Sequence, residues 1–300
     1  MTTLAPSPEH ASPGHASPAR GVLWMLVTTF MFVAMDTLAK HLSQTYPVPQ
    51  VVWARYLFHV LPLVILLGPR LPRVVRTERL GLQLLRSVFL LGATGMFFAA
   101  LSFIPLADAS AIMFVAPIVV TALSMPLLRE HVGPRRWAGV VVGFLGAVVI
   151  IRPGTEAMHP AALFAVGAAC CYALYQIATR VLSRTDAPLT TLVHSASVGA
   201  VITCAIVPFF WLAPAPLDWV MMAAMGMCGG LGHYTLIKAF HTAPAASIAP
   251  YGYSALIWAT LFGFVVFADL PDAWTVVGAV IIAGSGLYIY HRERVRRAAA

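Results

Sequence analysis

The sequence has 300 residues, of which 60% are hydrophobic and only 10% charged, and its mean hydropathy is +0.83. A soluble domain carries about a quarter charged residues because its surface faces water, so this composition excludes a soluble globular protein. The formal net charge is +8, but the arginines stand in short clusters beside apolar runs. That distribution is typical of topology-determining charges in membrane proteins. The sequence therefore predicts an integral membrane protein with the lipid bilayer, and no nucleic acid, as its surroundings.

The two ends of the chain differ from its apolar middle. Residues 1–20 are rich in Pro, Ala, Ser and His, so we expect a disordered cytoplasmic tail. The first apolar run starts at Gly21 and is too long for the core of a signal peptide, so we expect it to remain as a membrane helix. Residues 291–300 are predicted to form a basic cytoplasmic tail.

Apolar runs of about 20 residues, each long enough to cross a bilayer core, recur along the whole chain. They are interrupted by Pro, Gly and charged residues, which mark the expected ends of the helices. This pattern predicts ten transmembrane helices, at residues 21–41, 49–68, 82–103, 106–128, 134–151, 160–182, 189–210, 217–240, 246–268 and 273–290.

The basic residues predict the orientation. If the N-terminus is cytoplasmic, the outside loops hold only Lys40 and Arg152, and all other loop arginines lie inside. Both tails then lie inside, which requires an even number of helices. We expect a multi-pass protein of a cell inner membrane with both termini in the cytoplasm. The arginines expected inside are Arg20, Arg70, Arg73, Arg76, Arg79, Arg129, Arg135, Arg136, Arg180, Arg184, Arg292, Arg294, Arg296 and Arg297.

An internal repeat relates the two halves of the chain. Lys40-His-Leu-Ser-Gln-Thr45 is matched 140 positions later by Arg180-Val-Leu-Ser-Arg-Thr185, and Glu130 matches Asp269 at a spacing of 139. We therefore expect two five-helix units, residues 21–154 and 155–290. Because five is odd, the second unit must lie upside down in the membrane.

The predicted fold is thus all-α, a polytopic membrane bundle of ten transmembrane helices built from two inverted five-helix repeats. Inverted repeats are typical of secondary transporters, which bind their solute near the midplane between the halves. A duplication that serves only as a scaffold is the alternative reading.

Family-level motifs occur in both halves: Pro105–Ser110 leading to Pro117, Leu127–Trp137, Arg152–Gly154, Ala243–Pro250, Ile257–Gly263, and Leu270–Trp274 running into Gly284–Tyr288. With these motifs the chain after its tail resembles the drug/metabolite transporter superfamily, in particular its ten-helix EamA-type members. Ala268-Asp269 departs from the pattern, since members usually have Gly-Glu there. The motifs do not identify the solute.

Two further segments, Phe32–Lys40 and Val52–Arg55, resemble a subgroup of bacterial riboflavin importers and S-adenosylmethionine uptake carriers. This resemblance implies uptake of a vitamin or metabolite by alternating access. It favours a riboflavin-like solute, with S-adenosylmethionine or an amino-acid-type metabolite as alternatives.

Ionisable residues within a membrane span are costly and mark candidate functional positions. Asp36 and Arg55 are predicted at matching depths near the outer face, where they could form an ion pair, and Lys40 lies one turn beyond Asp36. The group is either a solute or proton site, or a structural pair that joins two helices. For Arg86 and Lys238, near the inner ends of their helices, we favour a snorkelling interfacial role over a functional one.

Imidazole and aromatic side chains complete the candidate solute or proton pathway. His59, His194 and His233, the last followed by Tyr234, suit proton coupling or serve as hydrogen-bonded core residues. Tyr172, Tyr175 and Gln176 share one predicted helix, and Tyr251, Tyr253 and Trp258 share another. Their rings would suit an aromatic solute, although aromatic residues near helix ends also form interface belts. Gln176, at mid-span, is expected to face a cavity.

Motifs of other protein classes are absent from the sequence. It contains no Walker motif, HExxH or nucleophile elbow, so we expect no catalytic residues, no metal and no cofactor. The four cysteines lie in apolar runs and are read as small apolar side chains. A lipid-carrier flippase or a metabolite exporter is the alternative function, followed by an intramembrane enzyme. The expected partner is a small organic solute, and a homodimer is left open.

Overall fold

The computed structural model describes residues 18–128, 133–155, 158–243 and 248–298, and every regular element in these ranges is helical. In chain order the elements are α1 (Pro18–Leu42), α2 (Val48–Leu67), η1 (Gly68–Arg70), α3 (Leu71–Val74), α4 (Leu80–Leu101), α5 (Leu106–Met113), α6 (Ala116–Leu128), α7 (Pro134–Ile151), α8 (Ala162–Leu182), α9 (Pro188–Ile206), η2 (Val207–Phe210), α10 (Pro216–Thr242), η3 (Ala249–Tyr253), α12 (Ser254–Phe267) and α13 (Ala273–Ala298).

Eight of the helical segments are long and apolar enough to cross a membrane, and two shorter apolar helices, Trp137–Ile151 and Ala273–Ile289, accompany them. Their surfaces expose many large apolar side chains, including Leu66, Phe209 and Val265. A helix satisfies its own backbone hydrogen bonds, which hydrocarbon requires. The chain is therefore a multi-pass membrane protein.

Most predicted helix limits agree with the structure within a few residues, but two predicted helices are broken. The predicted helix 106–128 divides at Phe114–Val115 into α5 and α6, and the described part of the predicted helix 246–268 contains η3 ahead of α12. Pro117 explains the first break, because proline has no N–H to donate and its ring collides with the preceding turn of a continuous helix. Pro250 has the same effect in η3.

Several predictions concern residues outside the described ranges. Residues 1–17 of the predicted tail, Arg129, Glu130 and Glu156 lie there, as do residues 244–247 of one family motif. The predicted basic tail, by contrast, is helical as far as Ala298, because α13 continues through it.

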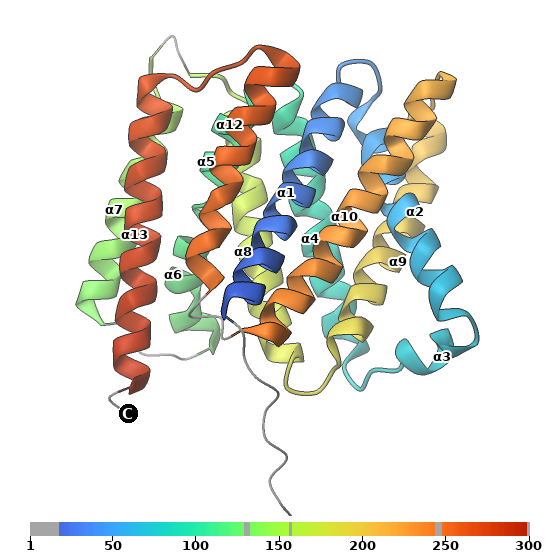
Figure 1. Ribbon diagram of the computed structural model, residues 1–300, viewed down its shortest axis with the longest axis horizontal. Helices are drawn as coiled ribbons and strands as arrows, with labels where there is room; N and C mark the ends of the chain where they lie inside the picture. Colours follow the sequence, from blue (N-terminus) through green and yellow to red (C-terminus); the bar gives the residue numbers. More distant parts are fainter. Residues whose placement is uncertain (1–17, 129–132, 156–157, 244–247, 299–300) are drawn as a thin grey trace, which may run out of the picture.

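The helices pack side by side, and the start of α1, the short α3 and the end of α13 lie at the same end of the bundle (Figure 1). Helix α1 packs against α10 and α4 against α8, while α2 contacts α9 and α7 contacts α13. Each of these pairs joins a helix of the first predicted half to one of the second.

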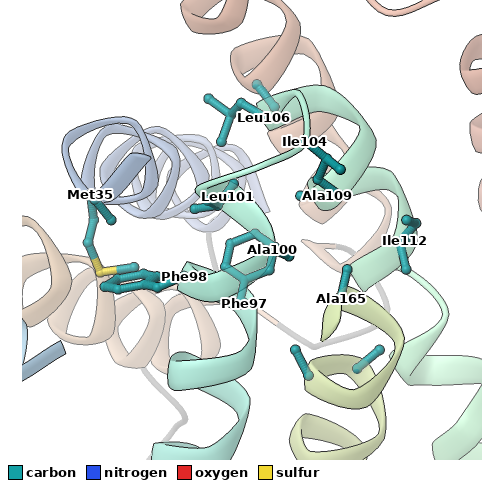
Figure 2. Packing of buried hydrophobic residues seen from close by; sticks show 14 of the residues in the cluster. Met35, Phe97, Phe98, Ala100, Leu101, Ile104, Leu106, Ala109, Ile112 and Ala165 are labelled. Carbon is teal, nitrogen blue, oxygen red and sulfur yellow. The ribbon is translucent and has the colours of Figure 1, made fainter. Parts of the chain in front are cut away.

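The core lies where α1, α4, α5 and α8 meet (Figure 2). Met35 of α1 reaches toward the Phe98 ring of α4, and Ala100, Ala109 and Ala165 are fully buried. Small residues allow helix backbones to approach closely, which is the main source of helix association in lipid.

The crossing of α7 and α13 depends on glycines. Ser285 Oγ donates a hydrogen bond to the Gly139 carbonyl oxygen at 2.6 Å. A Cβ atom added at Gly278 would lie only 2.6 Å from the carbonyl oxygen of Gly146, whereas one added at Gly284 would meet nothing within 4 Å.

This difference yields a matched pair of variants. Gly278→Ala should lower the free energy of unfolding by about 1–3 kcal/mol, because the new methyl group forces two backbones apart. Gly284→Ala, on the same helix, should unfold like the wild type. Thermal unfolding in detergent measures both, and equal melting temperatures for the two variants would disprove the close crossing.

Candidate functional site

A cavity of about 270 Å³ lies among α1, α2, α4, α5, α6, α8, α10 and α12. Its wall includes the charged side chains of Asp36 and Arg55 and the amide of Gln176. The remaining wall is mostly apolar, with the rings of Phe32, Phe97, Phe98, Phe114 and Tyr172. A mostly apolar concave wall with few polar groups is typical of a small-molecule site.

The two broken helices meet beside this cavity. The rings of Phe114, at the break between α5 and α6, and Tyr253, at the end of η3, stack with centroids 4.7 Å apart. These two residues are 139 positions apart in the chain, the spacing that relates Glu130 to Asp269. Phe114 and Pro117 line the cavity directly, so the first break contributes to its wall.

Arg55 of α2 is 5% exposed and only partly bonded. Its Nη1 donates to Thr94 Oγ1 at 2.6 Å, and its Nε lies 3.3 Å from Met35 Sδ. The guanidinium also lies against the rings of Tyr56 and Phe98, at 5.0 and 5.9 Å from their centroids. No carboxylate of the described residues lies within 4 Å of it.

Asp36 of α1 faces the same cavity without a direct protein partner in the described part of the chain. It forms neither the expected ion pair with Arg55 nor one with Lys40. The two side chains line one cavity, but the direct pairing that the sequence suggested is absent. The two opposite charges share one cavity and remain separate.

Lys40 turns away from Asp36 because better partners lie at the end of the bundle. Its Nζ donates to the carbonyl oxygen of Ile104 at 2.8 Å and lies 3.3 Å from Asp269 Oδ2. Nearby, Arg152 Nη2 lies 2.6 Å from Asp272 Oδ2. Burial raises the pKa of Asp272, but hydrogen bonds from Thr275 and the charge of the Arg152 guanidinium lower it by more. The net pKa is therefore below its usual value. The two ion pairs, Lys40–Asp269 and Arg152–Asp272, join the two halves of the chain.

Polar contacts join the halves at two further loops. The Tyr46 hydroxyl donates to Asp218 Oδ2 at 2.5 Å, and this bond raises the pKa of Tyr46. At the opposite end of the bundle, Thr77 and Gln83 donate to Asp186 Oδ2 at 2.6 and 2.5 Å. Burial raises the pKa of Asp186, but these bonds outweigh it and leave the net pKa below its ordinary value.

His59 and His233 stack on each other beside Arg55, with centroids 5.6 Å apart and planes 16° from parallel. His233 lines the large cavity, and both rings border a smaller one of about 10 Å³. His59 Nε2 is buried and has no hydrogen-bond partner among the described residues. His194 instead bonds the Thr190 carbonyl oxygen at 2.8 Å, as a hydrogen-bonded core residue does.

The snorkelling interpretation of Arg86 is wrong. The side chain is 3% exposed and is bonded entirely by uncharged groups. Its nitrogen atoms donate to Thr179 Oγ1 at 2.6 Å, the Thr191 carbonyl oxygen at 2.9 Å, Ser195 Oγ at 2.6 Å and the Tyr175 hydroxyl at 2.8 Å. It therefore ties α4 to α8 and α9 inside the bundle.

Helix α8 presents its polar residues on one side. Tyr172 and Tyr175 stack with centroids 5.5 Å apart. Tyr172 and Gln176 line the large cavity, as expected for Gln176, whereas Tyr175 borders the small one and bonds Arg86.

Other candidate residues lie away from the cavity. Tyr234 is 50% exposed on the outer surface of α10, with the ammonium group of exposed Lys238 5.5 Å from its ring centroid. This arrangement places both side chains on the outer surface and excludes Tyr234 from the wall. Trp258 packs edge-on against Phe30, and Tyr251 is exposed. Their rings do not line either cavity.

Sequence reasoning missed several residues of the site. Thr94 and Met35 bond Arg55, and Phe114 forms part of the wall, yet each is an ordinary residue of an apolar run. For Phe114, its spacing of 139 to Tyr253 was the available signal. Within the described ranges, no three His, Cys, Asp or Glu side chains are placed to hold a metal ion.

Comparison with known proteins places the chain among membrane transporters. The profile of the EamA-like transporter family matches residues 19–152 and again residues 159–290. The chain is 29% identical over 277 residues to the S-adenosylmethionine uptake transporter of Rickettsia felis, covering 91% of this chain and 93% of that protein. It is also 29% identical to the riboflavin transporter of Vibrio cholerae, covering 92% and 94%.

Two further comparisons add an exporter and a solved fold. The pseudopaline exporter CntI of Pseudomonas aeruginosa is 28% identical and covers 87% of this chain and 93% of its own. A solved crystal structure superposes with a TM-score of 0.61 at 20% identity, covering 95% of this chain and all of that one. This last likeness concerns the fold alone.

The hydrogen bonds of Arg86 lead to a test of whether the position needs a buried guanidinium with several acceptors or only a positive charge at the membrane interface. Arg86→Lys should lower the melting temperature by several degrees, because a compact ammonium cannot reach four acceptors held by the planar guanidinium. Arg76→Lys, at an exposed position, is the control and should have no effect. If Arg86→Lys melts like the wild type, the position needs only a positive charge.

Proposed function

We propose that this protein, which belongs to the EamA-like transporter family, is a secondary carrier that moves a small organic solute across a bacterial-type inner membrane by alternating access. The observation that carries the proposal is the cavity between the halves, whose wall holds a carboxyl and a guanidinium group that form no ion pair within the described residues. Charges inside a membrane protein normally have a partner or mark a transport pathway. Asp36, Arg55, Gln176 and His233 are the proposed solute contacts, because all four line that wall.

The proposed architecture is ten membrane crossings in two inverted five-helix repeats, residues 21–154 and 155–290. The two matches of one family profile support it, since they fall on these halves. The eight long apolar helices and two shorter ones supply enough segments.

The packing pattern also supports inverted halves. In each half we number the crossings from one to five, so that α1 and α8 are equivalent, as are α4 and α10. The contact of α1 with α10 then has its counterpart in the contact of α8 with α4, and α2–α9 and α7–α13 join equivalent helices. Such exchange of partners is expected of two copies related by a two-fold axis in the membrane plane.

The proposed orientation has both termini in the cytoplasm. Arg70 and Arg73 belong to η1 and α3, which lie at the same end as the start of α1 and the end of α13 (Figure 1). Lys40 and Arg152 belong to the other end and are neutralised by Asp269 and Asp272. This asymmetry follows the positive-inside rule.

Alternating access requires that contacts between the halves at the two ends break in turn. The Lys40–Asp269 and Tyr46–Asp218 contacts are candidates for the outer end, and the contacts of Thr77 and Gln83 with Asp186 for the inner end. Tyr46 and Asp186 are 140 positions apart, so they occupy equivalent places in the two repeats. Single polar contacts at water-facing ends are weak enough to exchange.

Uptake is the proposed direction, supported by relatives named as uptake and riboflavin transporters. Riboflavin and S-adenosylmethionine are accordingly the first solutes to test. Export is the second candidate, because the relative in Pseudomonas aeruginosa is an exporter. The resemblance to transporters gives an enzyme or a lipid-carrier flippase no comparable support.

Transport by purified protein in liposomes tests the proposal. Liposomes preloaded with unlabelled riboflavin, S-adenosylmethionine, amino acids or nucleosides should accumulate the corresponding labelled solute for at least one of them, without ATP. Asp36→Asn and Arg55→Gln should reduce the rate about tenfold or more, a loss of about 1.4 kcal/mol per tenfold. Glu78→Gln and Arg76→Gln, at exposed positions, are the matched controls. Accumulation no greater than in protein-free liposomes for the whole panel would contradict a carrier.

A further inference from the structure

We infer that the transported solute is amphoteric, with an anionic group that binds Arg55, a cationic group that binds Asp36 and an apolar or aromatic body between them. This inference rests on the proposed function and specifies its substrate class. It departs from the riboflavin-like solute that the sequence favoured, because riboflavin carries no charge at neutral pH.

Arg55 retains the capacity to bind an anion. Its Nε and Nη1 are engaged by Met35 and Thr94, but in the described part of the chain Nη2 has no acceptor. Both of these hydrogen-bond partners are uncharged, so the positive charge of Arg55 has no neutralising ion pair there. A guanidinium nitrogen with a free N–H can donate a charge-assisted hydrogen bond to a carboxylate, and such a bond is stronger than one between neutral groups.

Arg86 cannot take this role, although it lies in the neighbouring helices. Its three nitrogen atoms already donate to four acceptors, and the ring of Tyr175 covers it with its centroid 4.3 Å from the guanidinium carbon. Arg86 also lies outside the set of residues that line the large cavity. The anion site is therefore assigned to Arg55 alone.

Asp36 offers the complementary site for a cation. Lys40, the basic residue one turn away, is held by Ile104 and Asp269 at the end of the bundle, so it does not neutralise Asp36. The ring of Phe32, one turn before Asp36 on the same helix, lines the same cavity. An ammonium or sulfonium group beside Asp36 could thus contact both a carboxylate and the face of an aromatic ring.

The spacing of the two charges selects a solute that carries both signs. Asp36 and Arg55 are more than 4 Å apart and face one cavity, so a single bound molecule can reach both. An uncharged solute would exclude water from both groups and neutralise neither, which is costly in a medium of low polarity. A solute with one charge leaves the other group unpaired. An amphoteric solute neutralises both.

The rest of the wall fits the body of such a solute. Phe97, Phe98 and Tyr172 provide flat apolar surfaces, and the Gln176 amide provides one donor and one acceptor group. With about 270 Å³, the cavity is near the lower end of the usual range for small-molecule sites.

Binding to the purified full-length protein tests this assignment, with three probes: S-adenosylmethionine, its decarboxylated form and riboflavin. The wild type should bind S-adenosylmethionine about tenfold or more tightly than the decarboxylated probe, because only the former has a carboxylate for Arg55. In Arg55→Gln this preference should fall below about twofold. In Asp36→Asn both sulfonium probes should bind about tenfold more weakly, with the preference retained.

Glu78→Gln and Arg76→Gln should match the wild type throughout, and riboflavin should not bind. A preference for the carboxylate that persists in Arg55→Gln would overturn the assignment, and so would riboflavin binding that is unaffected by either cavity variant. If S-adenosylmethionine does not bind, L-tryptophan and L-methionine replace it, and failure of all three overturns the inference. Transport of an uncharged solute in the liposome assay would then leave the carrier function intact, whereas no transport of any solute would refute that function itself.

Discussion

The structure depends on one constraint: a charge enclosed by a membrane protein has to be neutralised or solvated by something inside the bundle. Arg86 meets this constraint with four uncharged acceptors from α8 and α9, and Lys40 meets it with Asp269 and a backbone carbonyl. These two side chains hold helices together. Asp36 and Arg55 meet the constraint only in part, since each faces the cavity and, among the residues that the structure describes, has no ion-pair partner. That difference separates structural charges from those available to a ligand.

Hydropathy predicted the fold well because the bilayer imposes a simple rule on each segment, namely about 20 apolar residues between polar ends. The limits of α7, for instance, agree at both ends with the prediction. Breaks within an apolar run are harder to predict, because a helix can lose one or two backbone hydrogen bonds without any polar residue in its sequence to mark the place. The run 106–128 contains Pro117, yet prolines also occur inside continuous helices of this chain, such as Pro62 in α2. The sequence alone does not distinguish the proline at a break from the proline inside a continuous helix.

The sequence predicted which residues belong to the candidate site better than it predicted the contacts that these residues make. Asp36, Arg55 and Gln176 stood out as polar residues within apolar runs, and all three line the cavity. The role of Arg86 was not predictable from its position, because Tyr175, Thr191 and Ser195 come from the other half of the chain. The prediction that Tyr234 belongs to the solute pathway was wrong for a different reason. It follows His233 directly, and on a helix the next residue points about 100° away, here to the outer surface.

Alternating access around Asp36 and Arg55 requires the two halves to lie in opposite senses across the bilayer. Thr45 and Thr185 are 140 residues apart, the spacing of the sequence repeat, and both are exposed in loops. The decisive measurement introduces a single cysteine at either position, in a chain whose four native cysteines are replaced by alanine, and labels intact cells with an impermeant maleimide. Inverted halves predict that Thr45→Cys is labelled in intact cells and Thr185→Cys only after permeabilisation. Labelling of both cysteines from the same side would contradict the inverted arrangement and the carrier mechanism built on it.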